Sequence, residues 1–178
     1  NGCVDDVLDI QINQPDSSVE IDAIVTHVTC FGGDDGSIIA EPFGGTPPYS
    51  TQNLYNLSAG THTIYVEDAN GCLEEKDYVI TEPDEILANL VDTEVDCFGA
   101  NNGSAISIAT GGVPPYTYLW SNGEILENID DGEAAEIDNL PPGTYFLNIE
   151  DAVGCEITEL FTIEEPSSSN LEIDAPES

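Results

Sequence analysis

The stretch that decides the fold lies at residues 116–123 and reads Tyr-Thr-Tyr-Leu-Trp-Ser-Asn-Gly. Large aromatic side chains stand at Tyr116, Tyr118 and Trp120, every second position, which is the period of a β-strand with one buried face. The Asn-Gly pair that follows is typical of the two-residue turn of a β-hairpin. We therefore expect a strand whose aromatic face lies in a core, followed by a tight turn.

The same two-residue period recurs elsewhere, and turn signals separate the runs. Apolar residues occupy every second position over 19–23 and over 145–149, and Asp-Gly, Asn-Gly and Gly-Gly-x-Pro-Pro sequences lie between such runs. The 16 glycines and 11 prolines suit many short connections. We expect one helical turn at most, over 133–136. The pattern predicts an all-β chain built from tandem small immunoglobulin-like β-sandwiches.

The stretch at 116–123 follows directly on a sequence that occurs twice in the chain. Residues 30–49 and 97–116 share Cys-Phe-Gly, Gly-Ser and Gly-Gly-x-Pro-Pro-Tyr at a constant offset of 67 residues. Residues 67–72 and 150–155 share Glu-Asp-Ala-x-Gly-Cys at an offset of 83 residues, so the second copy carries 16 extra residues between these motifs. Matches in this number and order indicate two tandem modules.

The two ends of the chain resemble parts of the same module. Residues 1–15 begin with the Asn-Gly-Cys that precedes a last strand, and the final segment has the Leu-Glu-Ile-Asp-Ala pattern of a first strand. Seams are marked by prolines, which cannot donate to a sheet ladder: Pro15, Pro83 and Pro166. We therefore predict the end of a preceding repeat at 1–15, a first repeat at 16–83, a second repeat at 84–166, and the first strand of a following repeat or a linker at 167–178.

Acidic residues dominate the composition. The 178 residues include 36 Asp or Glu and a single basic residue, Lys76, which gives a formal charge of −35. Binding to nucleic acid or to an anionic membrane surface is excluded, because both need Lys and Arg. Membrane insertion is not expected either, since no apolar run approaches about 18 residues. The charges repel one another, so we expect a surface adapted to salt or one with specific cation sites.

In order along the chain, the motifs are Cys-Phe-Gly-x3-Gly-Ser, Gly-Gly-x-Pro-Pro-Tyr, Leu-x2-Gly-Thr, Asp-Ala-x-Gly-Cys and Glu-Pro. This ordered set resembles the SprB repeat, a family that builds very large cell-surface adhesins of gliding and related Bacteroidetes. The resemblance extends over essentially the whole chain. It implies secretion, an extracellular location at the cell surface, and tandem β-sandwiches that act as a stalk or an adhesive filament.

The two repeats differ after Pro-Pro-Tyr. Members of the family continue with a strand that ends in Trp and a short Asn-Gly hairpin. The second repeat has both, whereas the first reads Ser-Thr-Gln-Asn-Leu-Tyr at 50–55 and lacks them. The second repeat also carries a longer acidic segment at 124–138. We interpret this segment as an exposed loop, either one that binds cations or a basic partner or one that is simply solvated.

The cysteines stand at matching places in the two repeats: Cys30 and Cys97 near the start, Cys72 and Cys155 before the last strand. A zinc site is not expected, because no Cys-x-x-Cys pair occurs and only two histidines are present. We predict Cys30–Cys72 and Cys97–Cys155 disulfides, each stabilising its repeat by about 4 kcal/mol. The partner of Cys3 would then lie upstream of this chain. Free structural thiols are the alternative.

Acidic residues also cluster in turns, where calcium would find the oxygen ligands that it prefers. We predict a calcium site on such residues, with ordinary turn formation as the alternative. An EF-hand pattern is absent from the sequence. The candidate metal ligands are Asp34, Asp35, Glu67, Asp68, Glu150 and Asp151.

Aromatic rings are the usual platform for sugars, which makes Trp120 and Tyr118 the candidate ligand-binding residues. Their alternation favours the core face of a strand instead. His62 starts an alternating run and is expected to be a packed strand residue. Catalysis has little support, because neither histidine lies in a recognisable motif and a chance pair of carboxylates carries no weight among 36 acids.

We therefore expect a non-catalytic structural and adhesive module: a disulfide-stapled, acidic stalk that contacts neighbouring repeats of its own chain and that calcium rigidifies. Self-assembly into filaments through a terminal strand is a further expectation. Two alternatives stay open. One is a calcium-dependent, lectin-like module that binds surface glycans, and the other is an accessory domain of a secreted polysaccharide-degrading enzyme.

Overall fold

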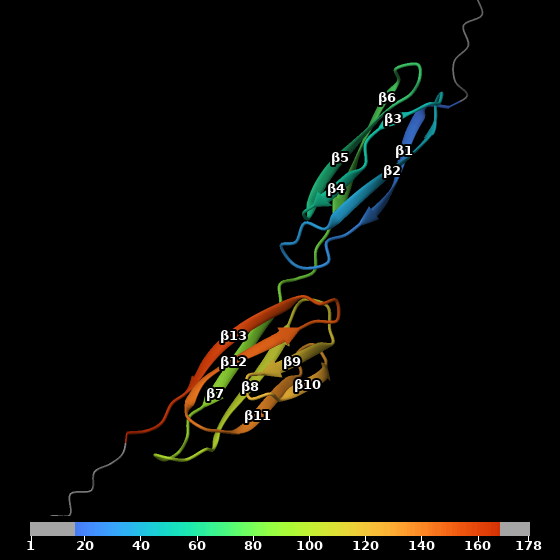
Figure 1. Cartoon of the computed structure of the whole chain (residues 1–178). Helices are drawn as coiled ribbons and strands as arrows, with labels where there is room; N and C mark the ends of the chain where they lie inside the picture. The colour runs from blue at the N-terminus through green and yellow to red at the C-terminus, as the bar shows by residue number, and fades with distance from the viewer. Residues whose placement is uncertain (1–16, 168–178) are drawn as a thin grey trace, which may run out of the picture. The chain divides into compact units, whose positions relative to one another are not determined.

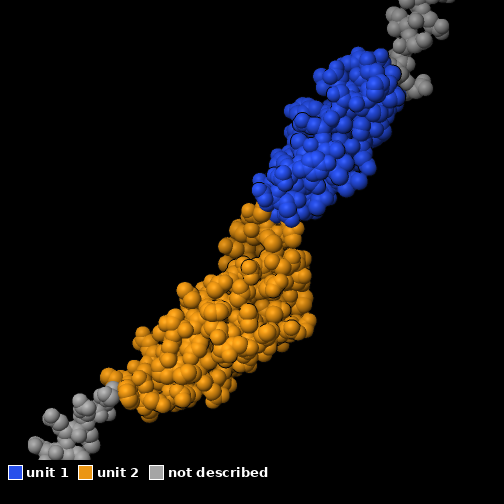
Figure 2. Space-filling model, viewed as in Figure 1, with its two compact units in different colours: residues 1–28, 34–81 blue, residues 29–33, 82–178 orange. Residues whose placement is uncertain are grey.

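The computed structural model describes residues 17–167, which form thirteen strands and no helix (Figure 1). Within this part of the chain, no helix long and apolar enough to cross a membrane is present. The strands form two compact units (Figure 2). Unit 1 contains residues 17–28 and 34–81, and unit 2 contains residues 29–33 and 82–167. The segment Thr29–Gly33 of the first repeat therefore belongs to unit 2.

The boundary between the units lies next to the predicted seam at Pro83. The repeat fragments predicted at 1–15 and from 168 onward lie outside the described residues. Each unit consists of antiparallel strands in two sheets, with the core between them. The predicted class, an all-β chain of immunoglobulin-like sandwiches, is confirmed.

Unit 1 has two three-stranded sheets, in the orders β1-β2-β4 and β3-β5-β6. Its strands are β1 (Val19–Thr26), β2 (Gly36–Gly44), β3 (Ser50–Thr51), β4 (Leu54–Leu57), β5 (Gly60–Glu67) and β6 (Leu73–Ile80). The expected alternation over β1 is confirmed, because buried and exposed positions follow one another from its first residue. Ile21, Ile38 and Ile64 are among the side chains that the two sheets bury between them.

Unit 2 has one three-stranded sheet, in the order β11-β8-β7, and one four-stranded sheet, in the order β10-β9-β12-β13. Its strands are β7 (Leu87–Thr93), β8 (Gly103–Thr110), β9 (Tyr116–Trp120), β10 (Ile125–Ile129), β11 (Ala134–Leu140), β12 (Gly143–Glu150) and β13 (Glu156–Ile163). Strand β10 has no counterpart in unit 1, and it comes from the extra residues of the second repeat. The predicted Asn-Gly hairpin is confirmed, since β9 and β10 pair antiparallel across it.

The core of unit 2 contains the aromatic face of β9. Tyr116, Tyr118 and Trp120 are at most 1% exposed, so their predicted place on the core face is confirmed. The inward positions of β8 carry small residues, Gly, Ala, Ser and Ala in turn, which leaves room for three large rings. The Trp120 ring also meets Phe161 of β13 edge to face, with ring centroids 5.9 Å apart.

The acidic segment 124–138 is not the loop that the sequence suggested. It contains β10 and most of β11, and β11 carries Ala135 and Ile137 into the core while its acidic residues face solvent. The helical turn expected over 133–136 is also wrong, because β11 begins at Ala134. Both strands have a register shift along their pairing, so the two-residue period that reveals a strand is interrupted.

Candidate functional site: the cysteine loops and the end turns

Each repeat has a tight turn before its last strand, residues 68–72 in the first and 151–155 in the second, which we call the end turns. In the second, the buried Asp151 accepts hydrogen bonds at Oδ1 from the N–H groups of Val153 (3.0 Å) and Cys155 (2.9 Å). Its Oδ2 accepts one from the N–H of Val113 at 2.9 Å. One carboxylate therefore holds the turn and ties it to a distant loop.

The first repeat has the same arrangement. Asp68 Oδ1 accepts from the N–H groups of Asn70 and Cys72, both at 2.9 Å, and its Oδ2 accepts from the N–H of Thr46 at 3.0 Å. These three donors act on a carboxylate that is buried, 5% exposed. The N–H of Cys72 lowers the pKa of Asp68 below its usual value, and the N–H groups of Thr46 and Asn70 act in the same direction, although burial opposes them. The ionised form is the one that the turn requires.

The Gly-Gly corner explains why two motifs far apart in sequence occur together. Gly45 and Gly112 have positive φ angles of 56° and 61°, a backbone conformation that side chains disfavour. A Cβ atom at Gly45 would lie 2.9 Å from Asp68 Oδ2, and one at Gly112 would lie 2.8 Å from Asp151 Oδ2. The Gly-Gly-x-Pro-Pro-Tyr and Asp-Ala-x-Gly-Cys motifs thus form one structure.

The tyrosine that ends the first of these motifs closes the corner. Tyr116 donates its hydroxyl to the carbonyl oxygen of Gly111, as Tyr49 does to Gly44. Burial, together with the hydrogen bond to Asp131, raises the pKa of Tyr116 to about 12. The hydroxyl therefore stays protonated and remains a donor at any physiological pH.

The two repeats also share the geometry of a loop that follows their first strand. We call these loops, residues 29–33 and 96–100, the cysteine loops. In the first loop, the N–H of Gly33 donates to Cys30 O at 3.0 Å, and the N–H of Gly32 donates to Glu82 Oε2 at 2.6 Å. Glu82 therefore helps to hold the first cysteine loop, a role that the sequence motifs did not predict. A sequence pattern that could have indicated this role is the Glu-Pro pair that ends both repeats.

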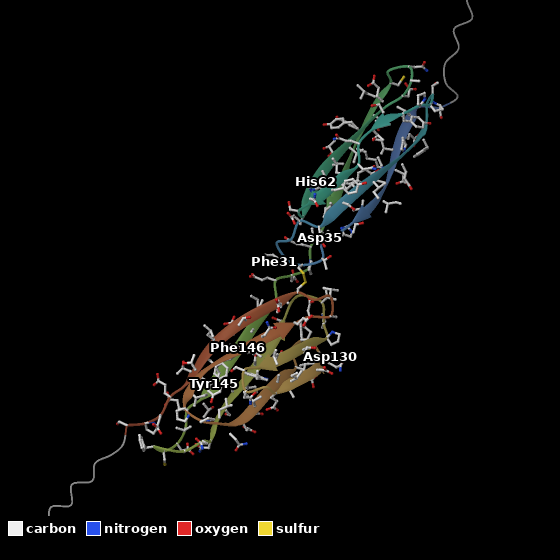
Figure 3. All side chains as sticks on the ribbon, in the orientation of Figure 1. Phe31, Asp35, His62, Asp130, Tyr145 and Phe146 are labelled. Carbon is white, nitrogen blue, oxygen red and sulfur yellow. A yellow bond between two sulfur atoms is a disulfide. The ribbon has the colours of Figure 1, made fainter. Side chains whose placement is uncertain are left out.

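One disulfide is present among the described residues, between Cys30 and Cys155 (the yellow bond in Figure 3). Both belong to unit 2, with Cys30 in the segment Thr29–Gly33. Cys72 and Cys97 are exposed thiols. The predicted pairs, Cys30–Cys72 and Cys97–Cys155, are therefore wrong: the bond joins the first repeat to the second instead of closing each repeat on itself.

The physical reason is that a repeat carries its two cysteines at opposite ends. Ile86, just before β7, contacts the same glycine corner as Asp151, so the end turn lies at the start of β7. The second cysteine loop follows the other end of this strand. Seven residues of strand span roughly 23 Å. A disulfide requires Cα atoms within about 7 Å, so the two cysteines of one repeat are too far apart to form one.

The comparison with protein families agrees with the sequence motifs. A model of the SprB repeat matches residues 23–60 and residues 90–124. This chain carries two stretches that match the SprB repeat. The resemblance inferred from the motifs is confirmed, and SprB repeats belong to cell-surface adhesins. The matched stretches include both cysteine loops and both Gly-Gly corners, whereas the end turns lie outside them.

The comparison with solved structures gives a low-scoring likeness, on which nothing further is based. A solved structure, described as the structure of an amphioxus IgVJ-C2 molecule, aligns at 16% sequence identity with a TM-score of 0.33. The alignment covers 85% of this chain and 98% of that one. Among curated proteins, none matches the chain.

The metal ligands proposed from the sequence fall into two groups in these SprB-like repeats. Asp68 and Asp151 are buried, and their oxygens already accept from N–H groups, which repel a cation. Asp34, Asp35, Glu67 and Glu150 are exposed. Among residues 17–167, no group of three or more His, Cys, Asp or Glu side chains is placed to hold a metal ion. Calcium binding stays a prediction.

The proposed ligand-binding residues Trp120 and Tyr118 lie in the core, where no ligand from solution can reach their rings. This corrects the prediction that these two residues bind a ligand, whereas glycan binding through the loops of the second repeat stays a prediction. His62 occupies a structural position: its Nε2 lies 2.9 Å from Ser58 O, as the Tyr145 hydroxyl lies 2.7 Å from Pro141 O. Each ring thus holds the turn before its own strand. Both residues are labelled in Figure 3.

Proposed function

We propose that this chain is a non-catalytic spacer of a secreted cell-surface adhesin, which bears tension while the cell attaches to or glides over a surface. One observation carries the proposal: the Cys30–Cys155 bond closes a loop with a sequence separation of 125 residues. Tension applied at the ends of the chain therefore passes from residue 30 to residue 155 through two sulfur atoms. The strands between them are removed from the covalent path of the force.

The extracellular setting agrees with this role. Disulfides form and persist in oxidising compartments, and a loop of this length stabilises its fold by about 5 kcal/mol in the chain-entropy model. The charge of −35 keeps neighbouring molecules apart. The one basic side chain, Lys76, donates to Ile21 O at 2.9 Å and lies 5.3 Å from the Tyr78 ring centroid, so it stabilises its own unit.

Pulling single molecules by their termini tests the proposal. An extended residue spans about 3.3–3.6 Å, so the closed loop withholds roughly 410–450 Å of chain. We expect the contour length gained on complete unfolding to be shorter by that amount in oxidising buffer than after reduction. Cys30→Ser should abolish the difference, and Cys72→Ser should leave it unchanged. Equal contour lengths with and without reductant would show that the chain does not limit its own extension.

Calcium is tested separately, by the melting temperature in calcium and in chelator at matched ionic strength. A rise specific to calcium would show sites that exist only in the folded state. The exposed Asp34, Asp35, Glu67 and Glu150 would then be the ligands to substitute. Equal melting temperatures would show that ions act only by screening the surface charge.

A further inference from the structure

Two cysteines have no partner within the described residues, yet each lies in the same backbone setting as a cysteine that has one. Cys97 occupies the second cysteine loop and Cys72 occupies the first end turn, and both side chains are exposed. Their counterparts, Cys30 and Cys155, are bonded to each other. Within residues 17–167, one cysteine-loop cysteine and one end-turn cysteine are bonded to each other, and one of each kind is not bonded.

The two cysteine loops have matching hydrogen bonds. The N–H of Ala100 donates to Cys97 O at 3.0 Å, as the N–H of Gly33 does to Cys30 O at 3.0 Å. Glu165 Oε1 accepts from the N–H of Gly99, as Glu82 does from Gly32. The loop that holds Cys97 is therefore already in the conformation of a loop that forms a disulfide.

The two end turns match as closely. The N–H of Cys72 donates to Asp68 Oδ1 at 2.9 Å, and that of Cys155 donates to Asp151 Oδ1 at 2.9 Å. Asp68 N–H donates to Cys72 O at 3.0 Å, and Asp151 N–H donates to Cys155 O at 2.9 Å. The backbone around Cys72 therefore matches that around Cys155, and Cys72 lacks a sulfur partner within the described residues.

We propose that every repeat of the parent protein is joined to the next by a disulfide from its cysteine loop to the following end turn. Cys97 then pairs with the end-turn cysteine of the repeat after it, and Cys72 with the loop cysteine of the repeat before it. The evidence for a preceding repeat is residues 1–15, which repeat the sequence of an end turn and a last strand. The inference does not depend on the adhesive role.

The oxidation needs an electron acceptor, and a disulfide of a thiol–disulfide oxidoreductase supplies it. One cysteine thiolate attacks a sulfur of that disulfide and forms a mixed disulfide, with release of one acceptor thiolate. The second cysteine thiolate attacks the protein sulfur of the mixed disulfide and releases the other. The two repeats lose two protons and two electrons in total, and the acceptor gains them as a dithiol.

The mechanical consequence is a set of overlapping links. Cys97 lies inside the loop closed by Cys30 and Cys155, so a bond from Cys97 to a later repeat starts before the previous loop ends. Each repeat is then spanned by at least one covalent bond besides its backbone. A stalk of this kind cannot lose a repeat by unfolding without first breaking sulfur bonds.

A tandem chain tests the proposal, with residues 1–166 followed by residues 16–178 so that the Pro-Asp spacing of the first seam is kept. The chain is refolded in a glutathione redox buffer, alkylated, cleaved at Asp and Glu, and mapped by mass spectrometry without reduction. We expect a Cys97–Cys72 linkage in addition to Cys30–Cys155. The alkylated cysteines should be Cys3, the first copy's Cys72 and the second copy's Cys97.

Matched variants assign the linkage to the right copies. Cys72→Ser in the second copy should reduce the Cys97–Cys72 product at least about tenfold, because it removes the only partner held nearby by the chain. The same substitution in the first copy should leave the product unchanged. Pairing within a repeat, equal loss in the two variants, or alkylation of every Cys97 while Cys30–Cys155 forms would each overturn the proposal.

Discussion

Unit 1 and unit 2 have the same ends and different interiors. Both have an end turn held by a buried aspartate, a Gly-Gly corner packed against it, and a tyrosine that closes the corner. Their cores differ in size: fourteen buried hydrophobic residues form the main cluster of unit 2, and seven form that of unit 1. The strand that carries the large rings, β9, has five residues, whereas its counterpart β3 has two.

The difference indicates which features the repeat depends on. Sequence between the Gly-Gly corner and the last strands changes in length and in core content, yet the positions of the cysteine loops and end turns stay the same. In unit 1, the shortened β3 leaves a groove of about 310 Å³ beside β5, lined by residues that include Thr51, Tyr65 and Glu67. The shared parts include both places that hold cysteines, which agrees with a module that is joined to its neighbours.

The largest effect should come from removing the ring that unit 1 lacks. Trp120→Ala should destabilise unit 2 by about 3–5 kcal/mol, because a fully buried side chain leaves a cavity. Urea unfolding followed by circular dichroism measures the loss, and hydrogen exchange over β5 shows whether unit 1 is unaffected. The control is Leu119→Ala, since the neighbouring Leu119 is 40% exposed. Similar costs for both variants would mean that Trp120 does not organise the core.

A smaller loss of stability, equal in the two units, should follow from adding a side chain at the Gly-Gly corner. Gly45→Ala and Gly112→Ala each place a Cβ in a left-handed conformation and against a carboxylate oxygen, at a cost of about 1–3 kcal/mol. Hydrogen exchange over β5 reports unit 1, and exchange over β12 reports unit 2. Gly123→Ala is the control for backbone strain without crowding, because a Cβ there meets nothing. If a corner variant were tolerated in one unit alone, the two Gly-Gly corners would not be equivalent.

The smallest effect should be a change in how the stability of unit 1 depends on pH. Because hydrogen bonds depress the pKa of Asp68 in the folded state, its carboxylate contributes stability above the unfolded pKa of about 3.9, and that contribution is lost as the pH falls through the folded value. Asp68→Asn should therefore be less stable than the parent chain at pH 7, and the difference should close below about pH 4. Urea unfolding across this range measures it. Glu67→Gln, on the exposed neighbour, should follow the parent, and a constant gap for Asp68→Asn at every pH would contradict the assignment.

The fold could be read from the sequence wherever a local pattern reported burial. The alternation of β1, β9 and β12 and the Asn-Gly hairpin followed from the period of two and from turn chemistry. β10 and β11 were missed because irregular pairing interrupts that period. The roles of Asp68 and Asp151 were taken for those of metal ligands, although an aspartate two and four residues before backbone donors is also typical of a turn.

The disulfide could not be derived in this way. Matching positions in two repeats show that cysteines are equivalent, but they do not show which ends of the fold meet. That depends on the length of the first strand, which separates a cysteine loop from the end turn of its own repeat. The distance follows once the strand is known to run the full length of the sandwich, and only then is a bond within the repeat excluded.

The most direct test of the account is the disulfide map of this chain. The oxidised protein is alkylated before reduction, cleaved at Asp and Glu, and the linked peptides are identified by mass spectrometry. The account predicts a Cys30–Cys155 peptide pair, with Cys72 and Cys97 carrying the alkyl group. Recovery of Cys30–Cys72 and Cys97–Cys155 peptides would contradict it, and would show that each repeat is closed on itself.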